Sequence, residues 1–355
     1  MNNELTPWQR LVESMKLEEP DQVPVILPVT GFLLSDFVGI SVSQYFMDYK
    51  NQLKAQIAFQ KRFPDATLLL GFAPEFYMEV PTALGCNFTF TETFGFVAEP
   101  VAKEPEDIDK LEVPDPHHDG LMPNTLKALE HFAENVDPEI KRRYGYVDGW
   151  PVMIIAPFSV AAFVRGITQF MLDLIMNQDL AHKLLKIATE TTIEWIRAQE
   201  EIIGPTKYLL FVDDFSGLIS RDHFERFFVP YAQRVLEKHS KALVLFHNDS
   251  NTRHILKEIA RLYINGFHFG PDVDIGDAKR MIGDNVCLVG NVHPLRILLE
   301  GKPQDVERAC MKVISTGAPR GGYVLCSGGE MSRGTPLENI DMMIETAKEY
   351  GKYSR

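Results

Sequence analysis

Short apolar runs alternate with helical segments along most of this chain. Eight runs rich in Val, Ile, Leu and Phe have the length of buried strands, and several stop abruptly at polar residues. They lie at residues 23–29, 67–72, 152–158, 208–213, 242–247, 266–270, 286–291 and 323–327. Helical patterns fill the gaps at 48–63, 124–135, 169–203, 220–238, 252–263, 304–316 and 336–350. This alternation predicts an α/β protein whose parallel strands close into a (β/α)8 TIM barrel.

Two segments interrupt the alternation. Residues 88–97 are rich in Thr and Phe and partly alternate, which predicts an antiparallel β-hairpin inserted into the barrel. Residues 99–119 are rich in Pro and acidic residues and predict a surface loop with a short helical turn. An open doubly wound sheet has a similar periodicity, but no glycine-rich dinucleotide or phosphate-loop motif follows any run, which removes the simplest argument for it. We therefore expect residues 1–355 to form a single barrel domain.

Charge and cysteine content narrow the class of protein. The formal net charge of -13 disfavours binding to nucleic acid or to an anionic membrane, because both attract basic surfaces. The four cysteines form no CxxC pair and are too scattered for a disulfide framework. The N-terminal residues lack the pattern of a signal peptide, and no apolar run reaches the ~20 residues of a membrane helix. We expect a soluble protein of the cytoplasm.

Catalytic groups of a TIM barrel come from the C-terminal ends of different strands, which makes the list of candidates short. It contains Glu75 and Tyr77 after the second run, Phe158 at the end of the third, Asp213 and Asp214 after the fourth, His247 and Asp249 after the fifth, Asn291 and His293 after the seventh, and Cys326 and Glu330 around the eighth.

His247 and Asp249 are the best candidates for a metal site. Residues i and i+2 on extended backbone point the same way, and imidazole and carboxylate are both good zinc ligands. Cys326 or Glu330 would supply the third ligand from another strand. The alternative is that His247 only forms hydrogen bonds in the barrel mouth, while Asp249 caps the helix that begins near Thr252.

Other strand-end residues have less definite roles. Only one of the adjacent Asp213 and Asp214 faces the barrel axis, so we expect one to be catalytic and the other to stabilise a turn. His293 either transfers protons at the barrel mouth or is an ordinary surface residue. His268 lies between two phenylalanines, which favours a buried structural histidine. By residue type, Cys326 is expected to be a small buried hydrophobic residue. Only its position near a strand end makes it a candidate site residue.

Several motifs together resemble the uroporphyrinogen decarboxylase superfamily, whose members adopt a distorted (β/α)8 barrel. The resemblance covers most of the chain and is densest after Trp150. Its motifs are Phe211-Val212-Asp213-Asp214, Leu218-Ile219-Ser220 with Phe224, Phe228 and Pro230-Tyr231, His247-Asn248-Asp249, Gly290-Asn291-Val292, and Gly328 with Thr335-Pro336-Leu337-Glu338-Asn339.

The resemblance implies one of two activities, and the porphyrinogen decarboxylases fit poorly. Their N-terminal arginine motif would fall on residues 27–32, which contain no arginine. Their catalytic Asp would fall near Phe76, their pocket Tyr near Phe163 and their late His near Gly329. A tetra-acidic substrate without cationic partners would be repelled by an acidic protein.

The other branch contains zinc-dependent methyltransferases that exchange methyl groups with a corrinoid protein. The methyltransferases that act on thiols have a His-x-Cys motif and a second, distant Cys. In this chain His247 matches the His, but Asp249 stands at the position of the first Cys and Gly329 near that of the second. Imidazole and carboxylate are harder metal ligands than thiolate, so a metal bound by them favours a substrate oxygen over a sulfur atom. From this ligand set we infer demethylation of an ether, such as a methoxylated aromatic, with zinc at His247 and Asp249. The resemblance implies cobalamin on a separate corrinoid-binding protein. Glu75, Tyr77, Phe158 and Asn291 would bind the small methylated substrate.

Three classes stay open at this point: a corrinoid-dependent methyltransferase, a metal-assisted lyase or decarboxylase of a smaller acid, and a non-catalytic barrel. The sequence does not fix the oligomeric state, and a homodimer is one possibility.

Overall fold

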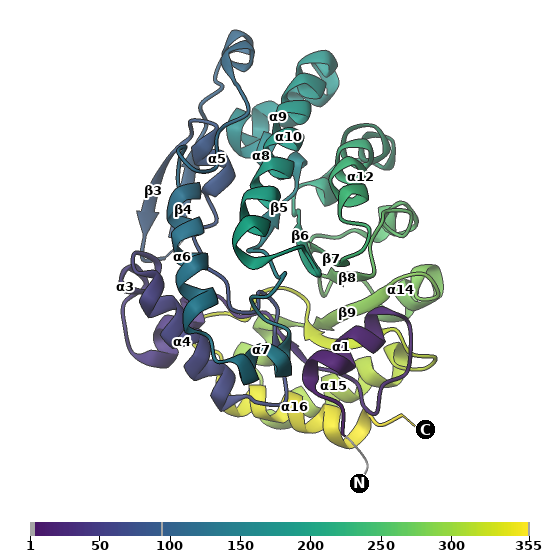
Figure 1. Cartoon of the computed structure of the whole chain (residues 1–355). Helices are drawn as coiled ribbons and strands as arrows, with labels where there is room; N and C mark the ends of the chain where they lie inside the picture. Colours follow the sequence, from purple (N-terminus) through teal and green to yellow (C-terminus); the bar gives the residue numbers. More distant parts are fainter. Residues whose placement is uncertain (1–3, 94, 354–355) are drawn as a thin grey trace.

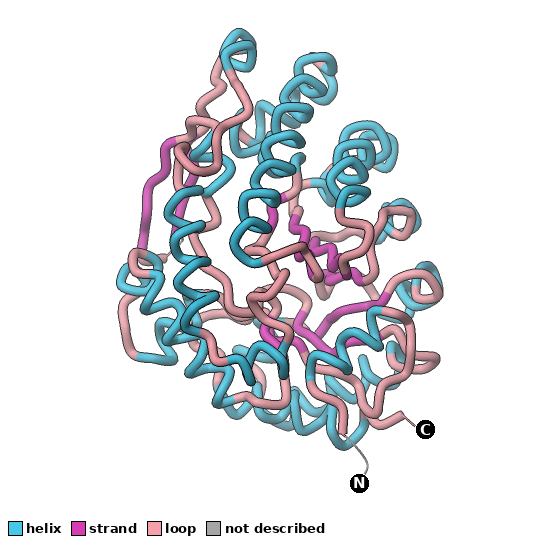
Figure 2. The backbone as a smooth tube through the Cα atoms, in the orientation of Figure 1, coloured by secondary structure: helices cyan, strands magenta, loops and turns pink. Residues whose placement is uncertain are grey.

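Eight parallel strands form the centre of the molecule. The computed structural model describes residues 4–93 and 95–353, and helices surround the strands on the outside (Figures 1 and 2). The central strands are β1 (Ile26–Leu27), β2 (Thr67–Leu68), β5 (Ile154–Ile155), β6 (Tyr208–Val212), β7 (Leu243–Asn248), β8 (Gly266–Phe269), β9 (Cys287–Val292) and β10 (Tyr323–Ser327). Each falls within or overlaps one of the eight predicted runs, which confirms the strand prediction.

The strands follow one another around the barrel in chain order. β10, β9, β8, β7, β6 and β5 form one parallel sheet, and β1 pairs with β2 in a second. A parallel bridge between Val25 and Leu325 joins the two sheets, with Leu325 donating its N–H to the Pro24 carbonyl at 2.9 Å. Between β2 and β5 the described residues form no ladder, so the barrel is distorted by an open seam at this place.

Tyr146 covers the seam. The Leu68 N–H has no strand partner there and donates to the Tyr146 hydroxyl, which in turn donates to Gln60 Oε1 at 2.7 Å. The Tyr146 ring packs edge-on against Trp150, with 5.3 Å between ring centroids. Just before β5, the Val152 N–H donates to Gln199 Oε1 at 2.8 Å. Side chains thus satisfy backbone groups that a regular barrel would pair between strands.

The helices cover the outside of the barrel. They are α1 (Pro7–Met15), α2 (Gly31–Val38), α3 (Val42–Phe46), α4 (Tyr49–Arg62), α5 (Glu79–Ala83), α6 (Met122–Asn135), α7 (Pro138–Tyr144), α8 (Pro157–Arg165), α9 (Ile167–Met176), α10 (Gln178–Ile203), α11 (Arg221–His223), α12 (Val229–Lys238), α13 (Leu256–Ile259), α14 (Ile275–Ile282), α15 (Pro303–Gly317) and α16 (Leu337–Tyr350). π-Helical turns at Phe224–Phe228 and Pro294–Leu299 continue the helical path after α11 and β9.

The predicted hairpin is confirmed. β3 (Asn87–Thr91) and β4 (Gly95–Glu99) pair antiparallel, and they stand on the outer left of the view in Figure 1. The predicted short helical turn in the acidic loop is the 3-10 helix Pro105–Lys110.

The third strand is much shorter than its apolar run. Pro157 occupies the first turn of α8, where its missing N–H and fixed φ are tolerated, so the helix starts inside the run predicted at 152–158. Phe158 therefore lies in a helix and not at a strand end. Its side chain is fully buried and packs against Phe170 and Phe228, with ring centroids 5.0 and 6.3 Å away. The prediction that Phe158 ends the third strand was wrong.

In the described residues no single helix is long and apolar enough to cross a membrane. α8 and α9 together have the length and composition for a crossing, but they are bent by 106° relative to each other.

Candidate metal centre

Strand register brings three acidic and imidazole side chains to one point at the barrel mouth. In the parallel ladder Val212 of β6 lies opposite His247 of β7, and His247 lies opposite His268 of β8. Side chains alternate between the two faces of a strand, so Asp214 follows Val212, and Asp249 follows His247, on the same inward face. The local sequence sets this alternation, whereas the register sets which residues meet.

Asp214, His247 and Asp249 form the group that is able to hold a metal ion in the described part of the chain. One ligand atom from each lies within 4.8 Å of the other two. His247 Nε2 is 3.4 Å from Asp214 Oδ1. An imidazole and two carboxylates match the nitrogen and oxygen donors of three-ligand catalytic zinc sites. The predicted meeting of His247 and Asp249 is observed, and Asp214 is the third member in place of Cys326 or Glu330.

Electrostatics in this group favour a bound cation. Burial by itself would raise the pKa of Asp214, but protonated His247 donates a hydrogen bond to it from Nε2 and carries a positive charge, and together these lower that pKa. Burial and the nearby Asp214 charge raise the pKa of Asp249. Burial would lower the pKa of His247, but Asp214 reverses this effect and raises it. The two carboxylates thus lie close together with only one imidazole to offset their negative charges. A divalent cation would relieve the repulsion between them.

Asp213 points to the outside of the strand and supports neighbouring loops. Its carboxylate accepts hydrogen bonds from the Ser159 N–H and hydroxyl at 3.0 and 2.9 Å and from the Ser216 N–H at 2.7 Å. Burial raises the pKa of Asp213 to about 7 despite these donors. The structure therefore separates the adjacent pair: Asp214 faces the cavity, and Asp213, which is fully enclosed, holds the start of α8 and the turn after β6.

A cavity of about 320 Å³ lies next to the candidate ligands. One wall is apolar, and the other carries acidic and hydroxyl groups. The lining residues are Pro28, Val29, Thr30, Phe32, Leu69, Leu70, Tyr77, Met153, Leu210, Val212, Asp214, His247, Asp249 and Glu330. No lysine or arginine occurs among these residues. The sequence suggested that Phe and Met residues near the mouth, Met153 among them, could line an apolar pocket, but it did not single out Phe32 or Leu69, which come from separate segments without a motif.

Glu75 supports the cavity wall from behind. Its buried carboxylate accepts hydrogen bonds from the Gly31 N–H at 2.8 Å, the Tyr77 hydroxyl at 2.6 Å, Gln56 Nε2 at 3.1 Å and the Tyr45 hydroxyl. Burial raises the pKa of Glu75 although each of these bonds lowers it. Tyr77 lines the cavity with φ at +60°, a conformation that side-chain-bearing residues seldom adopt. Of the four predicted substrate residues, Tyr77 thus lies at the cavity directly, and Glu75 holds the Tyr77 hydroxyl in place.

Glu330 faces the same cavity from the loop after β10. Its carboxylate accepts a hydrogen bond from the Thr30 hydroxyl. Burial raises the pKa of Glu330 to about 7, and the charges of Glu75 and Asp249 act in the same direction. It lies close to the metal candidates but is not one of the three convergent ligands.

Three further predicted residues do not line this cavity. Cys326 is fully buried with Sγ 3.5 Å from His268 Nε2, and burial keeps the pKa of its thiol well above the ordinary value. Asn291 donates to the carbonyls of Gly270 and Val273 at 3.1 and 2.7 Å. His293 caps the turn Pro294–Leu299 by accepting from two backbone N–H groups. Their positions at strand ends were predicted correctly, but the direction in which their side chains point was not.

The capping alternative for Asp249 is not observed. Arg253 donates its backbone N–H to Asn251 Oδ1 at 3.4 Å, and Thr252 at the helix start makes no side-chain cap bond. The neighbouring Asn248 is the residue of this segment that stabilises the loop, since its Oδ1 accepts from Ser250 N–H and hydroxyl at 3.1 and 2.5 Å.

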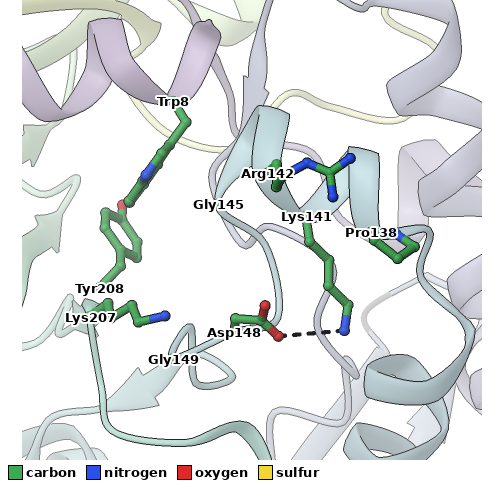
Figure 3. Close-up of a pocket in the computed structure, with 9 residues that line it drawn as sticks. All are labelled: Trp8, Pro138, Lys141, Arg142, Gly145, Asp148, Gly149, Lys207 and Tyr208. Carbon is green, nitrogen blue, oxygen red and sulfur yellow. Dashed lines mark hydrogen bonds and ion pairs between the residues drawn. The ribbon is translucent and has the colours of Figure 1, made fainter.

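A second cavity, of about 360 Å³, lies at the opposite end of the strands. Figure 3 shows it between Trp8 of α1, Lys141 and Arg142 of α7, and Lys207 and Tyr208 at the start of β6. None of the predicted site residues lines it, and Lys141 is paired there with Asp148 at 3.4 Å. The N-terminal face of a barrel serves mainly stability, so the mouth with the carboxylates is the better candidate site.

A sequence profile described as Uroporphyrinogen decarboxylase (URO-D) matches residues 6–350. The chain belongs to this family. Membership confirms the resemblance that the motifs indicated over most of the chain.

Relatives within the family have two kinds of activity in their names. The chain is 25% identical over 291 residues to a uroporphyrinogen decarboxylase of Dechloromonas aromatica, covering 78% of each chain. It is 28% identical over 252 residues to the methylcobamide:CoM methyltransferase MtbA of Methanosarcina mazei, covering 70% of this chain and 69% of MtbA. A solved methyltransferase structure from Methanosarcina mazei superposes with a TM-score of 0.81 at 24% identity, covering 98% and 99% of the two chains, which confirms the TIM barrel.

Proposed function

We propose that this protein is a zinc-dependent methyltransferase that moves a methyl group between a small methylated donor and a corrinoid carried by a separate protein. The observation that carries this choice is the charge of the cavity. Three carboxylates face it, and no lysine or arginine lines it. A carboxylate substrate would find no cationic side chain there and would meet three carboxylates, which disfavours both porphyrinogen decarboxylation and a lyase acting on a small acid.

Zinc fits the group Asp214, His247 and Asp249. Three protein ligands with one open position are the usual arrangement of catalytic zinc. Bound zinc would supply a Lewis acid that polarises the heteroatom carrying the methyl group. Because two of the three ligands are carboxylates and none is a thiolate, the set is hard and favours an oxygen over a sulfur atom. We therefore propose an ether, such as a methoxylated aromatic, as the donor.

The cavity suits such a donor. Its apolar wall, with Phe32, Leu70 and Met153, is able to hold one aromatic ring, and its volume of about 320 Å³ is that of a small-ligand pocket. In the transfer the methyl–oxygen bond breaks, and its electron pair stays on the oxygen, which leaves as phenolate or alkoxide. Cobalt(I) of the partner's corrinoid provides the two electrons of the new methyl–cobalt bond. The protein holds the donor and excludes water from it.

The cellular setting follows from the same reaction. All four cysteines are free and buried, in keeping with a reducing compartment. Cobalt(I) also requires a reducing environment, and we propose the cytoplasm.

Elemental analysis coupled to a cobalamin methylation assay tests the proposal. We expect stoichiometric zinc in the wild type and in the surface control His117→Ala, and loss of zinc in His247→Ala. We also expect an uncharged methoxylated aromatic to methylate cobalt(I) cobalamin, with no methylation by His247→Ala. Absence of zinc from every variant would leave a non-catalytic barrel. Zinc without methyl transfer, but with release of carbon dioxide from a small acid, would establish the lyase.

A further inference from the structure

His247 and His268 lie side by side inside the barrel. They are opposite each other in the parallel register of β7 and β8, and their Nδ1 atoms are 2.7 Å apart. At this distance one nitrogen carries the hydrogen and the other offers a lone pair. If His247 donates from Nδ1, its other nitrogen, Nε2, has a free lone pair. If His268 donates, the hydrogen of neutral His247 is on Nε2.

A backbone carbonyl of β10 determines which ring nitrogen of His268 carries the hydrogen. Its Nε2 is 2.7 Å from the Ser327 carbonyl oxygen, which has no hydrogen to give, so Nε2 must carry one. Cys326 Sγ, at 3.5 Å from the same nitrogen, is the more distant and weaker partner. The reverse tautomer would place a nitrogen lone pair against a carbonyl lone pair at close range.

A second proton on His268 is unfavourable. Its side chain is fully buried, and its described hydrogen-bond partners are His247, Ser327 and Cys326, none of them a carboxylate. An imidazolium at this position would therefore be an unpaired charge in the interior. With its one hydrogen on Nε2, His268 has a lone pair on Nδ1, and His247 must donate from its own Nδ1.

We propose that His268 is a positioning residue that holds neutral His247 in the Nδ1–H tautomer, so that the Nε2 lone pair points to the space shared with Asp214 and Asp249. A hydrogen-bonded chain thus runs from the Ser327 carbonyl through His268 to His247. Metal-binding histidines usually donate their second N–H to a carboxylate, a carbonyl or water. Here a neutral imidazole takes that place. The inference rests on the proposed function only in that zinc would use the lone pair.

Nitrogen-15 NMR of the metal-free protein tests the tautomer directly. The protein is labelled at histidine and measured at alkaline pH, where His247 is neutral, with His247→Ala and His268→Gln used for assignment. We expect a hydrogen on Nδ1 and none on Nε2 of His247, and a hydrogen on Nε2 of His268. A hydrogen on Nε2 of neutral His247 would overturn the proposal. Because this measurement needs no metal, its result is independent of whether zinc binds.

Two substitutions measure the consequence for metal affinity. In His268→Gln the side-chain oxygen is able to accept from His247 and the amide to donate to Ser327, whereas His268→Leu removes both bonds. We expect zinc affinity to fall about 10- to 100-fold in His268→Leu and only severalfold in His268→Gln. Thermal unfolding checks that both variants are folded; if His268→Leu is not, the NMR result decides. Equal zinc affinities in the wild type and both variants, or equal losses in the two, would refute the positioning role. Failure of the wild type to bind zinc, with the expected tautomer present, would refute the proposed function and not this inference.

Discussion

Asp249 Oδ2 lies 2.9 Å from the point where a Cβ on Gly329 would sit. In the thiol-specific pattern that the sequence resembles, residues near these two positions are both cysteines. Here the first position carries a carboxylate, and the absence of a side chain at 329 leaves room for it. Gly329 also has φ at +123°, where L residues are strained.

We expect Gly329→Ala to weaken zinc binding roughly tenfold, because the new methyl group displaces the Asp249 carboxylate at a cost of about 1–2 kcal/mol. The matched control is Gly334→Ala, where φ is +81° and the nearest atom to a Cβ is 3.9 Å away. Both variants have backbone strain, but only the first reaches Asp249. Isothermal titration with zinc makes the comparison. Equal affinities in the two variants would show that Asp249 is not a ligand.

Asp249→Cys should make the site softer. A thiolate in place of the carboxylate favours cadmium over zinc, so we expect the ratio of cadmium to zinc affinities to rise by at least about tenfold, or 1.4 kcal/mol. Competition titration of the two metals measures the ratio. Asp272→Cys, on the surface, controls for metal binding by an added thiol alone. An unchanged ratio in Asp249→Cys would argue against Asp249 as a ligand.

Glu79 should make stability depend on pH. Burial raises its pKa from 4.5 to about 7, and the described side-chain donor to its carboxylate is the Thr125 hydroxyl at 3.1 Å. The folded state therefore holds this proton more tightly than the unfolded state. The resulting stabilisation is complete below about pH 4.5 and is lost as the pH rises through about 7.

Glu79→Gln should remove this dependence, because the amide is neutral at every pH. We expect the variant to gain up to about 3 kcal/mol over the wild type between pH 4 and pH 8, with most of the change below pH 7. Urea unfolding across this range gives the difference. Glu130→Gln, exposed on the same helix as Thr125, is the control. A constant difference between Glu79→Gln and the wild type would show that folding does not raise the pKa of Glu79.

The sequence indicated where chemistry lies along the chain but not in which direction each side chain points. All candidates were at strand ends, yet Asn291 and Cys326 turn away from the cavity, and Phe158 belongs to a helix that Pro157 starts early. Asp213 and Asp214 could not be distinguished, since adjacent residues face opposite sides and the order of the two depends on where β6 begins its alternation.

The sequence by itself determined the alternation of strands and helices, the inserted hairpin and the pairing of His247 with Asp249 on one face. These features are local, because apolar runs and two-residue spacing act within a few residues of each other. Only the tertiary structure decided that Val212, His247 and His268 lie in register, which brings Asp214 to the metal candidates and His268 behind His247. Register arises from hydrogen bonds and packing between strands distant in sequence, and no short segment contains that information.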